Sequence, residues 1–158
     1  MLNACSSDQR VLGYLGRALS LELSAVQLYT TQACLASLWG LKPAAQRLRQ
    51  EASEEMQHAE RIIERMLALG VAPAASQLLP VRLGQSLPEL LFQAQAFEQE
   101  IVQLYADARQ HCARIGAHDD RLFFAALLQE EQQHQQGLLD WLHEVEGVQP
   151  QTARGWQT

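Results

Sequence analysis

The sequence has few of the features that mark disulfide-bonded, secreted or membrane-spanning proteins. Its three cysteines, Cys5, Cys34 and Cys112, are an odd and scattered set in 158 residues, which predicts reduced thiols rather than a disulfide framework or a zinc knuckle. No apolar run approaches the roughly 20 residues that a membrane-spanning helix needs, and no basic segment followed by an apolar stretch begins the sequence. We therefore expect a soluble, unprocessed cytoplasmic protein.

Positive charge and aromatic residues are also scarce. The chain has 12 Lys and Arg against 18 Asp and Glu, a net charge of −6. Because phosphate binding needs a basic patch, we expect no nucleic-acid partner. Aromatic residues make up 6% and hydrophobic residues 47% of the chain, which fits a bundle of helices better than a β-sandwich. The length predicts one domain with a sizeable core.

Helix start and stop signals predict four helices. Residues 6–8 (Ser-Ser-Asp) are good N-caps for a first helix, whose apolar residues recur near the 3.6-residue period until Gly40 ends it. Pro43 suits the first turn of a second helix, which should stop at Gly70. Residues 71–85 contain two prolines and a glycine and predict a long, ordered connection without a helix.

The second half repeats this layout. A capping box at residues 86–89 opens a third helix, Gly116 breaks it, and Asp119 can cap a fourth. Residues 1–146 should therefore form an all-α four-helix bundle, made of two antiparallel helix hairpins joined by a long crossover. Proline and glycine interrupt the tail, residues 147–158, so the sequence predicts an irregular segment and no clear fifth helix.

The predicted helices carry a duplicated arrangement of glutamate and histidine. Each half has a Glu-x-x-His motif with a further glutamate 33 positions upstream: Glu22, Glu55 and His58 in the first half, Glu98, Glu131 and His134 in the second. A glutamate and a histidine three residues apart share one helix face and offer two ligands to one point. One such motif would mean little, because exposed helix faces are rich in both residues. Four glutamates and two histidines with this duplicated spacing are what a two-iron site in a four-helix bundle requires.

The spacing also predicts where these side chains meet. In each half, the lone glutamate and the motif glutamate are equidistant from the predicted turn, at Gly40 in one hairpin and Gly116 in the other. Residues equidistant from the turn of an antiparallel hairpin lie at the same height. Two such hairpins that face each other would therefore bring all six side chains together at mid-height of the bundle.

The donor atoms indicate which metal such a site would take. Ligands rich in oxygen, with one imidazole per metal, favour iron or manganese over zinc or copper. We expect the motif glutamates, Glu55 and Glu131, to bridge two metals. The other ligands complete one metal position from each hairpin: Glu22 with His58, and Glu98 with His134. Two adjacent Fe(II) ions can each give one electron to O2 without the release of superoxide.

Tyr29 lies seven residues, about two helical turns, after Glu22 and therefore faces the same way. It could bond to a ligand or donate an electron, or it could be a buried core tyrosine that needs only one polar partner. The other three histidines, at the predicted helix ends or on exposed faces, are expected to be solvated: His111, His118 and His143.

Between about Val11 and Glu146 the chain resembles the bacterioferritins, within the ferritin-like two-iron superfamily. The resemblance rests on short motifs, of which Glu-Met-x-His-Ala is the most specific: Glu22-Leu-x-Ala-x-x-x-Tyr29, Trp39-Gly-Leu41, Glu55-Met-x-His58-Ala, Glu98, and Glu131-x-x-His134 followed by Asp140-Trp-Leu142. It implies an iron-storage and detoxification protein that oxidises Fe(II) to Fe(III) with O2 or H2O2. It also implies that the same six residues are the ferroxidase ligands.

The resemblance has further implications and two departures. Met56, one from each subunit of a two-fold dimer, would bind a b-type haem; packing at a dimer interface is the alternative for this side chain. A homo-oligomer, up to a 24-subunit shell, is implied, but residues 147–158 lack the short fifth helix that lines the four-fold axes of such shells. Gln50 stands where some members have a histidine on the inner wall, which leaves Glu54 as an inner iron contact.

Two other functions remain open. A small oxidase or peroxidase, similar to the rubrerythrins, would keep the two-iron centre without a shell, although the chain has no rubredoxin-type cysteine module. A haem-bearing subunit of a hetero-oligomeric ferritin is the other alternative. Intact ligands argue against it, because such a subunit could lose them freely.

Overall fold

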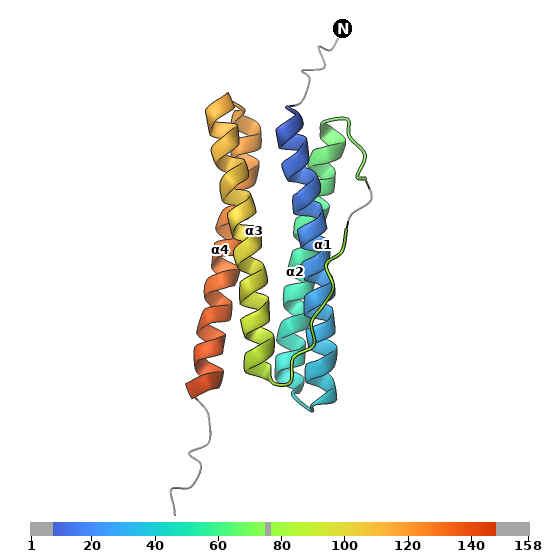
Figure 1. Ribbon diagram of the computed structural model, residues 1–158, viewed down its shortest axis with the longest axis vertical. Helices are drawn as coiled ribbons and strands as arrows, with labels where there is room; N and C mark the ends of the chain where they lie inside the picture. Colours follow the sequence, from blue (N-terminus) through green and yellow to red (C-terminus); the bar gives the residue numbers. More distant parts are fainter. Residues whose placement is uncertain (1–7, 75–76, 148–158) are drawn as a thin grey trace, which may run out of the picture.

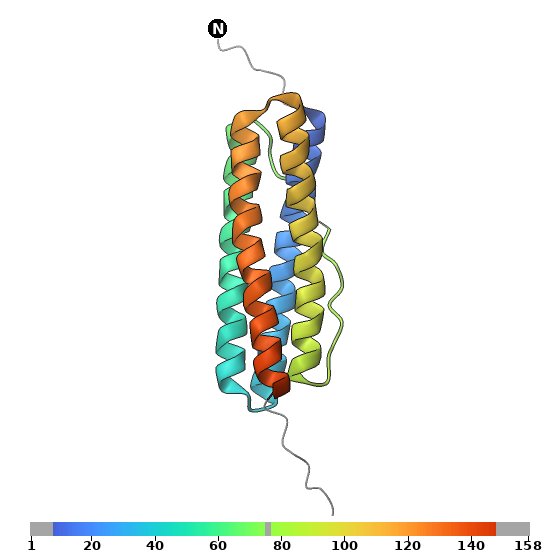
Figure 2. The same cartoon turned by 90° about the vertical axis from the view of Figure 1, so that its left-hand side faces the viewer.

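The computed structural model describes residues 8–74 and 77–147, which form four long helices (Figures 1 and 2). In chain order the helices are α1 (Gln9–Leu38), α2 (Lys42–Ala68), α3 (Leu87–Ile115) and α4 (His118–Gly147). Short turns join α1 to α2 and α3 to α4, so that the chain forms two antiparallel hairpins. The predicted all-α, ferritin-like bundle is confirmed.

The helix ends follow the local sequence. The Asp8 carboxylate accepts hydrogen bonds of 3.0 Å from the backbone N–H groups of Arg10 and Val11, and so caps α1. Gly40 and Gly116 close the two turns with φ angles of +77° and +70°, a conformation that favours glycine. One predicted cap is wrong. Because α4 begins at His118, Asp119 lies inside its first turn, where a carboxylate still complements the positive helix end.

A long connection links the hairpins. It leaves the end of α2 and runs along the bundle beside α1 before α3 begins (Figure 1). Two serine side chains of α1 hold it: the Ser20 hydroxyl accepts a hydrogen bond from the Gln77 N–H at 3.3 Å, and the Ser24 hydroxyl accepts one from the Leu79 N–H at 3.0 Å. Since the connection spans the length of the bundle, neighbouring helices run antiparallel throughout.

The two hairpins meet along two seams. In the α1/α3 seam the helix backbones lie closer together than in the α2/α4 seam. The core between the helices is apolar, with fully buried residues from every helix: Leu15, Leu48, Ile62, Leu91, Ile101, Phe124 and Leu127. At mid-height this core is interrupted by polar side chains. Those side chains form the candidate site.

Three further expectations concern the exposure of the other histidines, membrane-spanning helices and a fifth helix. His111 was expected to be solvated, but it is buried, and its Nε2 lies 3.0 Å from the Asp8 carboxylate, because the end of α3 reaches the start of α1. His118 and His143 are exposed, as expected. No helix in the described ranges is long and apolar enough to cross a membrane. The expected absence of a fifth helix concerns residues 147–158, all but Gly147 of which lie outside the described residues.

Candidate metal centre

All four helices contribute to a cluster of carboxylate and imidazole side chains at the middle of the bundle. It contains all six predicted site residues: Glu22 from α1, Glu55 and His58 from α2, Glu98 from α3, and Glu131 and His134 from α4. The four glutamates have no exposed surface, and only 4% of His58 is exposed. The hairpin register that was predicted from the spacing therefore brings these residues together.

The cluster divides into two overlapping sets of possible ligands. Within each set, one ligand atom from every residue lies within 4.8 Å of the others, and both sets contain Glu55 and Glu131. The first set adds the two residues of the first hairpin, and the second set adds those of the second hairpin: Glu22 with His58, and Glu98 with His134. The sequence predicted this division, with the motif glutamates shared.

The shared glutamates each face both histidines. The two carboxylate oxygens of Glu55 lie 3.1 Å from His58 Nδ1 and 2.9 Å from His134 Nδ1. Those of Glu131 lie 2.7 Å and 3.5 Å from the same two nitrogens. The imidazole rings stack with their centroids 5.4 Å apart. A carboxylate that offers one oxygen to each of two neighbouring positions has the arrangement of a bridging ligand.

Protons balance the charge of this buried cluster. Burial raises the pKa of Glu22 and of Glu98 well above the ordinary range, which favours the neutral form of both side chains. Burial opposes the charge on the histidines too, but the carboxylates of Glu131 and Glu55 beside them prevail and raise the pKa of His134 to about 11. The same contacts raise the pKa of His58.

The two shared glutamates behave in the opposite way. Burial alone would raise the pKa of Glu55 and of Glu131, but the nearby His134 and His58 imidazoles outweigh it and lower both. Without a cation, these shifts favour two carboxylates and two imidazolium groups, whose charges cancel. Two divalent cations could replace these protons.

Four buried oxygens of the cluster lack a hydrogen-bond partner. They are Glu22 Oε2, Glu98 Oε2 and both carboxylate oxygens of Glu131. Glu131 Oε1 is close to His58 Nδ1, but the contact does not have the alignment of a hydrogen bond. Buried polar atoms without partners are uncommon and call for an explanation such as an ion. These oxygens are hard donors of the kind that iron takes, so the residues present fit a pair of iron ions.

Two tyrosines join this cluster across the hairpins. The Tyr29 hydroxyl donates to Glu98, and the Tyr105 hydroxyl donates to Glu22 at 2.5 Å; both rings are fully buried. Burial, and then the neighbouring glutamate, raises the pKa of each tyrosine. Of the alternatives for Tyr29, the bond to an expected ligand is therefore present. Tyr105 was missed, although it follows Glu98 by seven residues, as Tyr29 follows Glu22.

Two more glutamates contact the outer nitrogens of the histidines. Glu130 lies 2.9 Å from His58 Nε2, and Glu54 lies 2.7 Å from His134 Nε2. Each immediately precedes the glutamate of a Glu-x-x-His motif, so the duplicated string is Glu-Glu-x-Gln-His. Glu130 was not predicted as a site residue, and Glu54 was expected only as an inner iron contact. The duplication could have identified both.

Comparison with known proteins agrees with this geometry. Residues 12–148 match the family model of the ferritin-like domain. The bacterioferritin of Rhodobacter capsulatus is 36% identical over 127 residues, which are 80% of this chain and 79% of that protein. The bacterioferritin of Brucella melitensis is 32% identical over 127 residues, with the same two shares. The chain belongs to the bacterioferritin family.

A solved structure of the Rhodobacter capsulatus bacterioferritin shares the fold. It is 34% identical, with a TM-score of 0.87, and the match covers 92% of this chain and 91% of that one. That structure has a metal-free dinuclear site and a haem iron in a crystallographic special position. Iron storage, as the resemblance implied, is the function that membership of the bacterioferritin family assigns to the chain.

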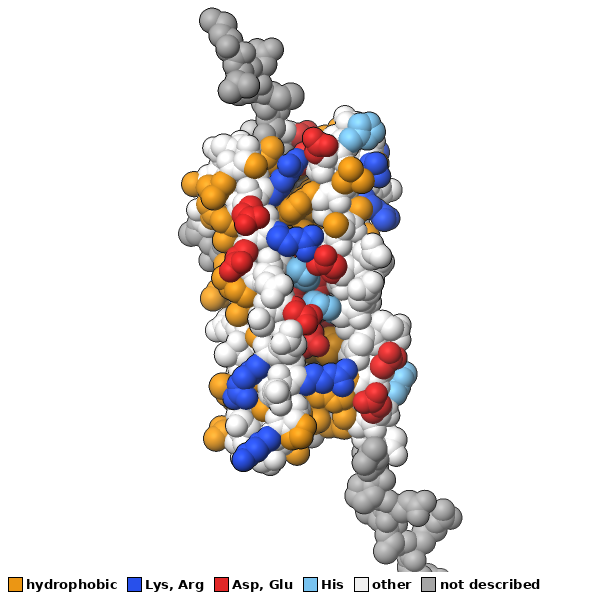
Figure 3. Space-filling model, turned by 180° about the vertical axis from the view of Figure 1, so that it is seen from behind, with side chains coloured by type: hydrophobic (Ala, Val, Ile, Leu, Met, Phe, Trp, Pro, Cys, Tyr) orange, Lys and Arg blue, Asp and Glu red, His pale blue; other side chains and the backbone are white. Residues whose placement is uncertain are grey.

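An opening connects the cluster to one face of this bacterioferritin. It lies in the α2/α4 seam and has a volume of about 400 Å³. Figure 3 shows histidine side chains beside acidic and basic ones in the middle of this face. The lining is polar and comes from both helices: Gln50, Glu54, Gln57, His58, Arg61, Glu130, Gln133 and His134. Cations in solvent therefore have a polar path to both imidazoles.

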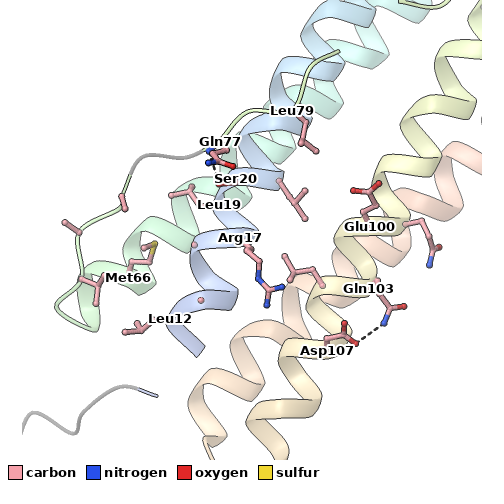
Figure 4. A pocket seen from close by; sticks show the side chains of 18 residues that line it. Leu12, Arg17, Leu19, Ser20, Met66, Gln77, Leu79, Glu100, Gln103 and Asp107 are labelled. Carbon is pink, nitrogen blue, oxygen red and sulfur yellow. Dashed lines mark hydrogen bonds between the residues drawn. The ribbon is translucent and has the colours of Figure 1, made fainter. Parts of the chain in front are cut away.

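A larger groove lies elsewhere and does not reach the cluster. It has a volume of about 1000 Å³ and is formed by α1, α3, the end of α2 and the long connection (Figure 4). Leu12 and Met66 contribute to its apolar part, while Gln103 and Asp107, hydrogen-bonded to each other at 2.9 Å, line its polar part. None of the six cluster residues lines it, so its size does not make it the candidate metal site.

Proposed function

We propose that this bacterioferritin oxidises Fe(II) to Fe(III) at the mid-bundle cluster and passes the ferric product to storage. The observation that carries the proposal is the position of Glu55 and Glu131, each of which offers one oxygen toward each of the two imidazoles. That arrangement suits two iron ions side by side. The proposed ligands of the two irons are therefore Glu22, Glu55, His58 and Glu131 for one, and Glu55, Glu98, Glu131 and His134 for the other.

The charges of the site favour this chemistry. Four carboxylates neutralise two Fe(II) ions, so the pair can be buried without net charge. Oxidation of both irons releases two electrons, which reduce one O2 with two protons to H2O2, or one H2O2 with two protons to two waters. Each Fe(III) adds one positive charge to the buried site, which favours departure of the ferric product. The α2/α4 opening, with its acidic Glu54 and Glu130, provides the path for iron.

Fe(II) oxidation by single-residue variants tests the proposal. Protein stripped of metal by chelation is mixed with Fe(II) in air, and formation of Fe(III) is followed by absorbance. We expect a fast phase that the Glu55→Ala and Glu131→Ala variants lose, because neither can hold two irons together. Glu60→Ala, at an exposed position of α2 outside the cluster, is the matched control and should keep the fast phase. Equal rates in all four proteins would reject the site.

The proposal includes a haem at Met56. This side chain is 38% exposed on α2, outside the cluster, although it follows Glu55 directly. The haem iron of the Rhodobacter capsulatus protein lies in a crystallographic special position, as a haem shared by two symmetry-related subunits would. We therefore expect a Soret band in the purified protein that Met56→Leu abolishes while the fast iron oxidation remains. A Soret band that survives this substitution would place the haem elsewhere.

The size of the assembly separates storage from the alternatives. We propose a homo-oligomer built from two-fold dimers, up to a 24-subunit shell, located in the cytoplasm, where the free thiols of Cys34 and Cys112 would stay reduced. Light scattering should then report particles of hundreds of kilodaltons. An isolated dimer would favour a rubrerythrin-like oxidase or peroxidase. Particles that form only with a second kind of subunit would favour a haem-bearing partner in a hetero-oligomeric ferritin.

A further inference from the structure

The two hairpins contribute the same kinds of proposed metal ligands, but the residues around their outer glutamates differ. Residues 76 positions apart correspond, so that Glu54 matches Glu130 and His58 matches His134. At Arg61 the two halves differ, because its counterpart is Gly137. Only one of the two outer glutamates can therefore have an arginine from this position beside it.

On the arginine side, three residues form a continuous chain of contacts. One carboxylate oxygen of Glu130, on α4, lies 2.9 Å from His58 Nε2 and accepts a hydrogen bond of 2.6 Å from an Arg61 guanidinium N–H. Arg61 and His58 are one turn apart on α2, so Glu130 is held between two groups of the facing helix. A guanidinium gives a charge-assisted hydrogen bond, which restrains the carboxylate more firmly than a neutral donor does.

On the glycine side, the restraint is weaker. Glu54, on α2, lies 2.7 Å from His134 Nε2 and accepts a hydrogen bond of 3.0 Å from the Gln50 side-chain amide, which is neutral. Gly137 has no side chain to offer on α4. The His134 side chain is also more exposed than that of His58, at 15% against 5%. The two imidazoles thus have the same kind of outer partner, held with different firmness.

We propose that Glu130 and Arg61 are positioning residues that hold the His58 imidazole with Nε2–H outward and Nδ1 toward the metal, and that Glu54 does the same for His134 without a charged anchor. The inference rests on the proposed ligand set. An outer carboxylate that accepts the N–H of a ligating histidine fixes its tautomer and ring orientation. The metal position of Glu22 and His58 consequently depends on α4 for its geometry.

The effect concerns orientation rather than stability of the fold. Glu130 and Arg61 are 42% and 36% exposed as side chains, and ion pairs at such positions contribute little to stability. Variants at these residues should therefore fold and assemble normally. Their melting temperatures, measured beside metal binding, check this.

Cobalt(II) binding under anaerobic conditions tests the proposal without iron oxidation. We expect two Co(II) per chain in the parent protein. The His134→Ala and His58→Ala backgrounds each leave one metal position to titrate. In the His134→Ala background, Glu130→Ala should weaken the remaining Co(II) on the order of 10- to 100-fold, and Glu54→Ala should leave it unchanged. In the His58→Ala background, Glu54→Ala should weaken the remaining Co(II), and Glu130→Ala should leave it unchanged.

Conservative variants separate positioning from packing. Glu130→Gln keeps an acceptor oxygen for His58 Nε2–H, so it should retain most of the affinity that Glu130→Ala loses. Arg61→Met removes the anchor and keeps the hydrocarbon stem, and it should weaken only the position of Glu22 and His58, by less than Glu130→Ala does. The visible spectrum of bound Co(II) reports the change in ligand geometry. Glu60→Ala is the control that should alter neither affinity nor spectrum.

Three outcomes would overturn the inference. Glu130→Ala could weaken Co(II) binding equally in the His134→Ala and His58→Ala backgrounds, or it could leave Co(II) binding unchanged in both. It could also remove a third Co(II) while the two others bind as before, which would make Glu130 a ligand. Binding of fewer than two Co(II) by the parent protein would instead contradict the proposed ligand set, and normal Co(II) binding without iron oxidation would contradict only the proposed reaction.

Discussion

The α1/α3 seam and the α2/α4 seam join the same two hairpins but are built from different interactions. Across α1/α3, the contacts are buried: two tyrosine–glutamate hydrogen bonds, and a 2.8 Å hydrogen bond from the Gln32 amide to the Leu90 carbonyl. Across α2/α4, histidines, glutamates and arginines meet beside solvent. Arg47, for example, lies over the Trp141 ring with its guanidinium carbon 4.2 Å from the ring centroid.

The two seams contribute differently to the bundle. The buried seam joins the two hairpins through hydrogen bonds and supplies two tyrosine-bonded glutamates, whose pKa values burial raises. The seam beside solvent supplies the charged glutamates and both histidines, together with the opening to the surface. Rigidity and access are therefore provided by opposite faces, and substitutions in the two seams should have different consequences.

The largest expected effect is the release of protons when divalent cations bind to the cluster. Glu22 and Glu98 have raised pKa values, and so do His58 and His134 in the other seam. Two divalent cations that bind these four side chains should therefore displace roughly four protons per chain at neutral pH. A pH-stat measurement during Co(II) addition to chelator-treated protein gives the number. Glu98→Gln should release about one fewer. Release of only about two protons by the parent protein would mean that the glutamates of the α1/α3 seam are already ionised.

Truncation in the buried seam should have the next largest effect. Tyr105→Ala leaves a cavity and removes the partner of Glu22, so it should lower the free energy of unfolding by about 3 to 5 kcal/mol. Tyr105→Phe removes only the hydroxyl and should cost about 1 kcal/mol. Chemical denaturation of chelator-treated protein measures both. If the two variants were equally stable, the ring would contribute nothing beyond its hydrogen bond.

The smallest effect is expected in the α2/α4 seam. Arg65 makes hydrogen bonds of 2.5 and 3.0 Å to one oxygen of Asp120, but both side chains are partly exposed. Arg65→Ala should therefore lower the free energy of unfolding by about 1 kcal/mol or less. The loss should shrink further in high salt, which screens the pair, whereas the loss in Tyr105→Ala should not. A large, salt-independent loss would contradict the distinction between the seams.

Much of the fold and of the cluster followed from local sequence. Caps, glycines and the 3.6-residue period located the helices, and the equal spacing of Glu22 from Glu55 and of Glu98 from Glu131 placed their side chains at one height. These signals work because each depends on a single helix or hairpin. The assignment of the six cluster residues as iron ligands stays a prediction, which the variants described above test.

The residues that sequence reasoning missed depend on how the hairpins face each other. The Arg61–Glu130–His58 chain joins residues about 70 positions apart, and no pattern within one hairpin reveals it. His111 was wrongly expected at the surface for the same reason, since its partner Asp8 lies on the other hairpin. Tyr105 and the two outer glutamates, Glu54 and Glu130, are different, because the duplication was sufficient to find them.

The long connection has an electrostatic consequence. By returning the chain along the bundle, it makes each helix antiparallel to both neighbours (Figures 1 and 2). Each helix carries a dipole, positive at its N-terminal end, and antiparallel neighbours cancel one another's dipoles. No net axial field then draws a cation toward either end of the molecule, so attraction to its centre is exerted by the acidic side chains alone.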